Sequence, residues 1–229
     1  MNPAASTAAR KLRSGRTALQ LACLKDADGP NLLLLHELFG DKGDWSDAVL
    51  TWEGSVWALD FSGHGDSAWR EGGIYFPEIL VTDADAALAE LGEAFVAGAG
   101  VGAYAALLLA GGRPQAVHAA LLLPGEGLSG FGPEPQVAPD REAFARLTEA
   151  HRGSVDPSSQ PHDPRVLLAG ADTRPPDYAL TFAERANAVV LSEDGSARPP
   201  WWEGLREATG VTRSASDLGA ALRELRSLA

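Results

Sequence analysis

Two histidines could carry out proton-transfer chemistry in this chain. His36 and His64 each follow a short apolar run, 31–35 and 55–60 respectively. Three carboxylates stand near them in the sequence: Glu37, Asp60 and Asp66. An imidazole held beside a carboxylate can act as a general acid and base. The same imidazoles could instead bond to the backbone and shape their loops, and their spacing matches no metal-binding motif, so no metal site is predicted.

The apolar runs predict the elements that position these side chains. Short runs rich in Leu, Val and Ala alternate with stretches of helical periodicity, a pattern typical of βαβ units and a parallel sheet. The predicted strands are 17–24, 31–35, 55–60, 94–97, 116–123, 165–169 and 188–191. The predicted helices are 45–52, 82–93, 103–110, 140–151, 178–186, 201–208 and 216–228. Because open α/β sheets bind ligands at the carboxyl ends of their strands, the loops of His36 and His64 belong to the candidate site.

The whole chain is expected to form one domain. Its 229 residues suffice for one sizeable core. Residues 1–16 mix small and basic side chains and are expected to be flexible. Residues 125–163 are rich in Gly, Pro and Ser and hold too few large apolar residues for a core of their own. They are therefore predicted to form a lid or insertion at the sheet edge.

Composition and charge argue against several classes of protein. The formal net charge of −12 disfavours a nucleic-acid partner, because the protein would repel phosphates. No apolar run is long enough for a membrane span, and the N-terminus lacks the pattern of a secretory signal. The single cysteine, Cys23, allows neither an internal disulfide nor a cysteine-based zinc site. These features fit a cytoplasmic protein without a cofactor, and they leave its oligomeric state open.

A glycine-rich turn, residues 98–102 (Gly-Ala-Gly-Val-Gly), follows the predicted strand 94–97. Gly98 and Gly102 would let the strand and the following helix approach closely, while the residue midway between them projects above the sheet. Gly100 holds this projecting position and has no side chain with which to attack a carbonyl. It instead suits the positive φ that such a turn requires.

Four segments in this order resemble the α/β-hydrolase superfamily. They are Leu32–Gly40 (LLLLHELFG), Val56–Ser67 (VWALDFSGHGDS), Phe95–Ala103 (FVAGAGVGA) and Val166–Asp172 (VLLAGAD). The second segment is the most specific, since it is similar to the family's D-x-x-G-x-G-x-S loop. The resemblance spans about residues 17–228 and implies a three-layer fold, in which helices flank a mostly parallel central sheet.

The same resemblance implies a catalytic triad that this sequence does not complete. Gly100 stands where the family has its nucleophile, and Asp172 matches the acid at the end of a later strand. The family's histidine is expected in the stretch 192–199, near Ser196, yet no histidine follows His162. A nucleophile without its base would be weak even if it were restored. Gly100, Asp172 and Ser196 are therefore interpreted as vestigial positions.

A ligand site is predicted around the glycine turn. Where the family normally has glycine after its loop histidine, this chain has Glu37, whose carboxylate either faces the pocket or points to solvent. A glycine at the turn would leave extra volume for a small apolar or acyl-type ligand. The residues expected to line this volume are His36, Glu37, Leu38, Gly100, Val101 and Tyr104.

The sequence favours a protein that has lost serine-hydrolase catalysis and binds a small ligand or a protein partner. Two alternatives stay open. One is a hydrolase or lyase that uses His36 or His64 with a carboxylate. The other is a scaffold whose fold serves only protein interactions. Because fold alone does not determine function, the sequence leaves open whether any catalysis remains and which ligand is bound.

Overall fold

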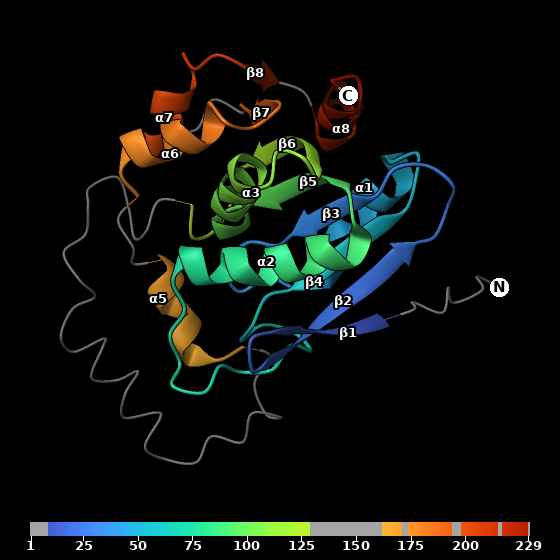
Figure 1. The fold of residues 1–229 in the computed structure, drawn as a ribbon, viewed down its shortest axis with the longest axis vertical. Coiled ribbons are helices and arrows are strands. Elements are labelled where there is room, and N and C mark those ends of the chain that lie inside the picture. Colours follow the sequence, from blue (N-terminus) through green and yellow to red (C-terminus); the bar gives the residue numbers. More distant parts are fainter. Residues whose placement is uncertain (1–8, 129–161, 171–173, 194–197, 215–216, 229) are drawn as a thin grey trace.

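The computed structural model describes residues 9–128, 162–170, 174–193, 198–214 and 217–228 (Figure 1). Within these ranges one sheet has eight strands: β1 (Ala9–Ser14), β2 (Thr17–Lys25), β3 (Leu32–Leu35), β4 (Val56–Asp60), β5 (Ala94–Ala99), β6 (Val117–Leu123), β7 (Val189–Ser192) and β8 (Val211–Ser214). The helices are η1 (Lys42–Trp45), α1 (Ser46–Thr51), α2 (Pro77–Leu91), α3 (Val101–Gly112), η3 (Pro164–Val166), α5 (Leu167–Gly170), α6 (Pro176–Ala183), α7 (Pro200–Leu205) and α8 (Leu218–Arg226). None of the helices in these ranges has the length and apolar character needed to cross a membrane.

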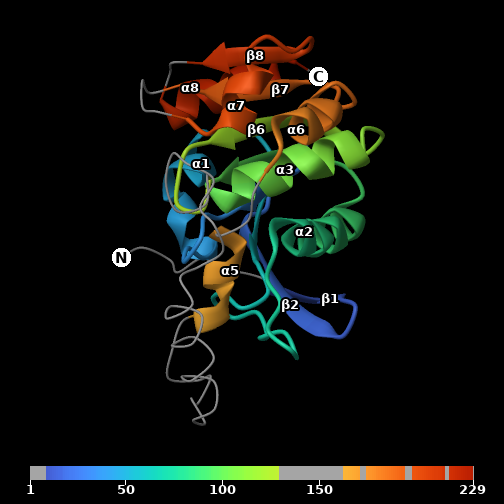
Figure 2. The ribbon, with the colours of Figure 1, turned by 90° about the vertical axis from the view of Figure 1, so that its left-hand side faces the viewer.

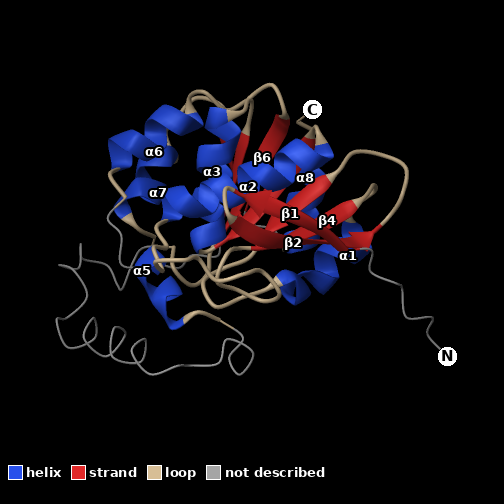
Figure 3. Cartoon of the chain, turned by 60° about the horizontal axis from the view of Figure 1, so that its bottom comes forward, coloured by secondary structure: helices blue, strands red, loops and turns tan. Residues whose placement is uncertain are grey.

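The strand order brings the candidate loops together. The sheet runs β1-β2-β4-β3-β5-β6-β7-β8; β1, β2 and β4 pair antiparallel, and every pair from β4 to β8 is parallel. Figure 3 shows the β1–β2 hairpin beside β4. Strand β3 lies between β4 and β5, so the loops that follow these three strands leave the same edge of the sheet side by side.

The sheet is buried on both faces, which gives the three-layer architecture that was predicted. Leu33 and Leu35 of β3 pack into a core with α2, α3, α6 and α7, whereas Leu32 and Leu34 pack into a second core with α1 and α8. Figure 2 shows α1 and α8 on one side of the sheet and α2, α3 and α6 on the other. A strand buried on both faces reads as a continuous apolar run, as the four leucines of β3 do.

The prediction of a strand at 165–169 is wrong, because this segment forms the short helices η3 and α5. Short apolar runs do not distinguish a strand from a buried helix. Here Pro164 occupies the first helical turn, and the Asp163 carboxylate accepts a hydrogen bond from the Arg165 amide as an N-cap. Val166 and Ala169 are then buried in the core on the α2–α3 face.

Two strands were missed. Ala9–Ser14, in the segment expected to be flexible, forms a strand that pairs with β2 through a turn at Gly15, where φ is +58°. Strand β8 (Val211–Ser214) pairs with β7 at the far edge of the sheet, and its polar sequence Val-Thr-Arg-Ser gives no apolar signal. The predicted helix 140–151 and most of the predicted insertion lie outside the described residues.

Candidate functional site

The turn that joins β5 to α3, here called the elbow (residues 98–102), has the expected geometry. Gly100 adopts φ +56° and ψ −122° and precedes the first residue of α3. A Cβ atom on Gly98 would lie 2.1 Å from the Gly102 carbonyl oxygen, and one on Gly102 would lie 2.2 Å from the Leu35 carbonyl oxygen. Glycine is therefore required at both flanking positions, because strand and helix approach too closely for a side chain.

The space above Gly100 is filled by the loop that follows β6. A Cβ atom on Gly100 would lie 2.0 Å from the carbonyl oxygen of Glu126, well inside van der Waals contact. The end of β6, from which this loop leaves, is tied to the elbow by the Gly100 amide, which donates to the Leu123 carbonyl at 3.1 Å. The prediction of extra volume above Gly100 is therefore wrong, since the backbone of the chain itself occupies it.

The Glu126 carbonyl oxygen sits between two backbone amides. It accepts hydrogen bonds from Val101 N at 3.0 Å and from Leu38 N at 3.1 Å. One amide directly follows the projecting position of the elbow, and the other comes from the loop after β3. In hydrolases with this type of turn, amides at these two places form the oxyanion hole, which binds the negative oxygen of the transition state. In this chain both donors are already bonded to an internal acceptor.

The side chain of Glu37 binds the backbone amide of Glu126. Its carboxylate accepts a hydrogen bond from the Glu126 amide at 2.7 Å, so Glu37 faces the elbow. A Cβ atom on Gly125 would lie 2.3 Å from this carboxylate, which explains why glycine precedes Glu126. Three hydrogen bonds thus fix the backbone of Glu126 over the elbow: one to its N–H and two to its carbonyl.

His36 is buried, and the backbone engages both of its ring nitrogens. Nδ1 lies 2.7 Å from the Glu37 carbonyl oxygen, and Nε2 lies 3.0 Å from the Phe61 amide nitrogen. An amide can only donate, so Nε2 is the acceptor, and the ring proton is on Nδ1. Burial lowers the pKa of His36, which keeps the ring in this neutral form. The imidazole therefore joins the loops after β3 and β4 and has no ring nitrogen left for a substrate.

The ring of His64 lies between those of His36 and His162, each tilted 57° to it; these three residues are here called the histidine stack. The ring centroid of His64 is 4.8 Å from that of His36 and 5.4 Å from that of His162, and His64 and His162 also form an isolated β-bridge. Nδ1 lies 3.3 Å from the Ser62 carbonyl, while Nε2 has no hydrogen-bond partner within the described part of the chain. Burial and then the neighbouring His36 and His162 lower the pKa of His64 well below its usual range.

The carboxylates near these histidines are engaged elsewhere. Buried Asp60 accepts hydrogen bonds from the Lys42 amide at 2.8 Å, the Lys42 ammonium at 2.8 Å and the Asp66 amide at 2.9 Å. The exposed carboxylate of Asp66 accepts from the same ammonium at 2.7 Å. Within the described ranges neither His36 nor His64 is hydrogen-bonded to a carboxylate, so the acid–base pair considered from the sequence is not assembled there.

The remaining predicted positions lie apart from the elbow or outside the described residues. Asp172 and Ser196 are both outside them. Because 165–169 is helical, the last two strands in the described ranges are β7 and β8, and the acid and histidine that the resemblance implies would follow them. Glu193, directly after β7, accepts a hydrogen bond from Arg206 at 2.6 Å. Tyr104 is fully buried, with its ring 5.1 Å from that of Trp201, and so packs in the core beneath α7.

Two contributors were missed from the sequence. His162 was assigned no role from the sequence, yet it is half-buried against His64, and nothing in its sequence context indicates that contact. The loop around Glu126 did carry a signal, because Gly125 and Gly127 flank it and both adopt positive φ, at +158° and +76°. In the described ranges, no group of three His, Cys, Asp or Glu residues could hold a metal ion.

Comparison with known proteins relates this chain to hydrolases and to one epimerase. No family model matches the sequence. Esterase Rv0045c of Mycobacterium tuberculosis is 30% identical over 129 residues, a match that covers 55% of this chain and only 39% of that esterase. The crystal structure of an alpha/beta hydrolase from Novosphingobium aromaticivorans superposes with a TM-score of 0.65 at 17% identity, covering 98% of this chain and 99% of that one. The bottromycin epimerase BotH, in complex with Bottromycin A2, gives a TM-score of 0.61 at 22% identity and covers 96% of both chains.

Proposed function

We propose that this chain, which has the α/β-hydrolase fold, does not hydrolyse esters or amides at its elbow and acts instead by binding a small apolar ligand or a protein partner elsewhere on its surface. One observation carries the proposal: the carbonyl of Glu126 occupies the two-amide site beside Gly100. A substrate carbonyl could reach these amides only if three hydrogen bonds were broken and the loop after β6 moved away.

The sequence adds two independent losses. Gly100 offers no oxygen or sulfur for attack, and no histidine follows His162 to act as a base after the last two strands. Removing any one member of a catalytic triad already costs several orders of magnitude in rate. The nucleophile, the base and the free oxyanion donors are all missing. The elbow therefore has the backbone geometry of a hydrolase but not the groups that catalyse hydrolysis.

The comparisons concern the fold and do not assign a reaction to this chain. Structural likeness below 25% identity speaks only for the fold, and the same fold carries unrelated functions. One of the proteins that share it is an epimerase by name. The fold alone therefore does not imply that this chain is a hydrolase.

The test is a serine-directed fluorophosphonate probe combined with turnover of p-nitrophenyl acetate and butyrate. We expect no labelling of the folded chain and no release of p-nitrophenol above the rate given by the unfolded chain. A second arm uses Gly100→Ser, which we expect to remain inactive because no histidine follows His162 to activate the new serine. Stoichiometric labelling of one serine in the native chain, with ester turnover lost on its replacement by alanine, would overturn the proposal.

A further inference from the structure

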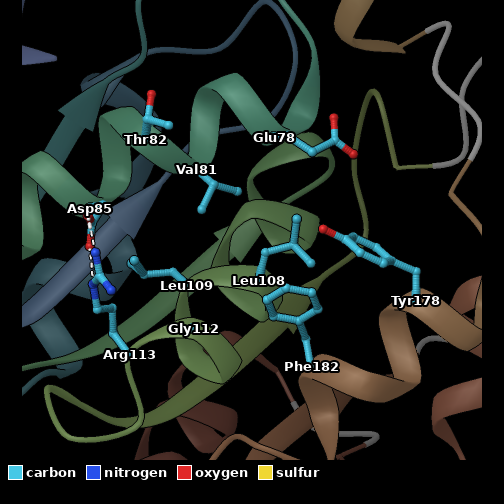
Figure 4. A pocket seen from close by; sticks show the side chains of 10 residues that line it. All are labelled: Glu78, Val81, Thr82, Asp85, Leu108, Leu109, Gly112, Arg113, Tyr178 and Phe182. Carbon is cyan, nitrogen blue, oxygen red and sulfur yellow. Dashed lines mark hydrogen bonds and ion pairs between the residues drawn. The ribbon is translucent and has the colours of Figure 1, made fainter. Parts of the chain in front are cut away.

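A cavity separate from the elbow lies between α2, α3 and α6. It has a volume of about 260 Å³, and Figure 4 shows side chains from all three helices pointing into it. On α3 it is lined from Leu108 onward, about two helical turns beyond Gly100. Its walls belong to ordered helices and involve neither the loop after β6 nor the histidine stack.

The floor of the cavity is apolar and its outer wall is aromatic. Val81 of α2 and Leu108 and Leu109 of α3 form the floor. Tyr178 and Phe182 of α6 form the wall, with ring centroids 5.1 Å apart at an interplanar angle of 60°. Tyr178 is 42% exposed, so part of this wall is open to a ligand from solvent.

The polar groups at the rim carry net negative charge. Asp85 is neutralised by Arg113, whose Nε and Nη2 donate to the two carboxylate oxygens at 2.8 Å each. Glu78, in the first turn of α2, has no ion-pair partner in the part of the chain that the structure describes. An aromatic wall and an unneutralised carboxylate together attract cations, since ring faces also carry partial negative charge.

We propose that this cavity binds a small organic ammonium that carries an aromatic or branched apolar substituent. The substituent fills the space over Leu108 and Leu109, and the ammonium lies near Glu78 and the ring of Tyr178. The volume is below the 300–1,000 Å³ usual for drug-sized ligands, so the ligand is correspondingly small. The formal net charge of −12 raises the local concentration of such cations. The inference rests on the proposed function, because it supplies the binding surface that a closed elbow lacks.

Gly112 provides a way to fill the cavity without disturbing the core. A Cβ atom there would meet no atom closer than Phe182 Cε1 at 4.0 Å, so a larger side chain can extend into the open space. Gly112 is the last residue of α3, where replacement of glycine also favours the helix. Gly112→Leu should therefore fold normally and reduce the volume open to a ligand.

The experiment titrates the full chain with 2-phenylethylammonium and with 3-phenylpropionate, which has a similar ring and chain but the opposite charge. Binding is followed by NMR at the amides of Leu108, Leu109 and Phe182. We expect saturable shifts with the ammonium and none with the carboxylate. Glu78→Gln should weaken binding about threefold, as an exposed charge would, and Gly112→Leu should weaken it at least as much. Glu207→Gln removes an exposed carboxylate elsewhere and should bind like the native chain.

Equal affinity for the two compounds, unchanged binding by Gly112→Leu, or equal weakening by Glu207→Gln and Glu78→Gln would each overturn the assignment. These outcomes do not depend on the fate of the elbow, because no ester is present and the reporting amides lie on α3 and α6. Fluorophosphonate labelling with normal ammonium binding would contradict only the proposed function. Absent ammonium binding in a chain that is inert to the probe would contradict only the cavity assignment.

Discussion

The carbonyl of Glu126 accepts a hydrogen bond from the amide of Val101 at 3.0 Å, and this contact caps α3 from outside the helix. Val101 is the first residue of α3, and the N-cap residue Gly100 has no side chain with which to satisfy an amide. The first amides of a helix need acceptors, and a carbonyl oxygen also complements the positive end of the helix dipole. The loop after β6 thus stabilises the helix at the place where a catalytic relative would receive its substrate.

Gly100→Ala should be much more destabilising than its positive φ alone explains. The new Cβ atom would lie 2.0 Å from the Glu126 carbonyl oxygen, so the loop must move and its two bonds to Val101 and Leu38 must weaken. We expect a loss of about 3 kcal/mol or more in the free energy of unfolding, measured with urea.

Gly15→Ala is the matched control for that substitution. Gly15 has φ +58°, close to the +56° of Gly100, but a Cβ atom there would meet nothing within 4 Å. Gly15→Ala should lower the free energy of unfolding by about 1–2 kcal/mol, which is the cost of the backbone conformation alone. Equal losses at the two positions would show that the loop after β6 does not press on Gly100.

Glu37→Ala should loosen the same loop. It removes the acceptor of the Glu126 amide, whereas Glu37→Gln keeps an oxygen at that place. We expect hydrogen exchange at the Leu38 and Val101 amides to accelerate about tenfold or more in the alanine variant, and less in the glutamine variant. Unchanged exchange of both amides in Glu37→Ala would mean that the carboxylate does not hold the loop.

The sequence predicted the fold well because its strongest signals are local. Four consecutive leucines in β3 and the glycine spacing of the elbow each follow from nearby residues, and both were confirmed. The prediction of a strand from the run Val-Leu-Leu-Ala at 166–169 was wrong because it, too, used only local residues. Its apolar residues fit a strand or a buried helix, and the N-cap Asp163 with Pro164 decided for the helix.

The position of the Glu126 carbonyl at the elbow could not be predicted from local sequence patterns. Glu126 meets Val101 and Leu38 only because β6 lies beside β5 in the sheet, and sequence spacing does not reveal which carbonyl of a loop reaches a given amide. An empty volume was therefore expected at Gly100. The glycines on both sides of Glu126 were the one available indication of an unusual backbone.

Asp60→Asn should destabilise the loops beside the histidine stack more than Asp66→Asn. Both carboxylates bond to the Lys42 ammonium, but the Asp60 side chain is fully buried whereas that of Asp66 is 71% exposed. We expect the free energy of unfolding to fall by about 2–3 kcal/mol in Asp60→Asn, because buried charged hydrogen bonds are lost. In Asp66→Asn it should fall by less than about 0.5 kcal/mol. Urea unfolding of both variants measures the difference, and equal losses would contradict this account of the loop.

The histidine stack should make the fold less stable below neutral pH. Burial lowers the pKa values of His36, His64 and His162 in the folded chain from about 6.5. As the pH falls below 6.5, the unfolded chain takes up protons that the folded chain does not yet bind. The free energy of unfolding then decreases, by at most about 1.4 kcal/mol per pH unit for each such histidine. Urea unfolding between pH 8.5 and 5 should therefore show a plateau above about pH 7 and a fall below it.

His64→Phe isolates the contribution of the central ring. Phenylalanine keeps an aromatic ring between His36 and His162 but cannot take up a proton. The decrease in the free energy of unfolding below pH 6.5 should therefore become less steep, by the slope that about one proton contributes. Above pH 7.5 the slopes of the variant and the native chain should coincide, because none of the three rings titrates there, whatever the substitution does to absolute stability. If the variant lost stability with the native slope below pH 6.5, the buried imidazole of His64 would not be the group that couples protons to folding.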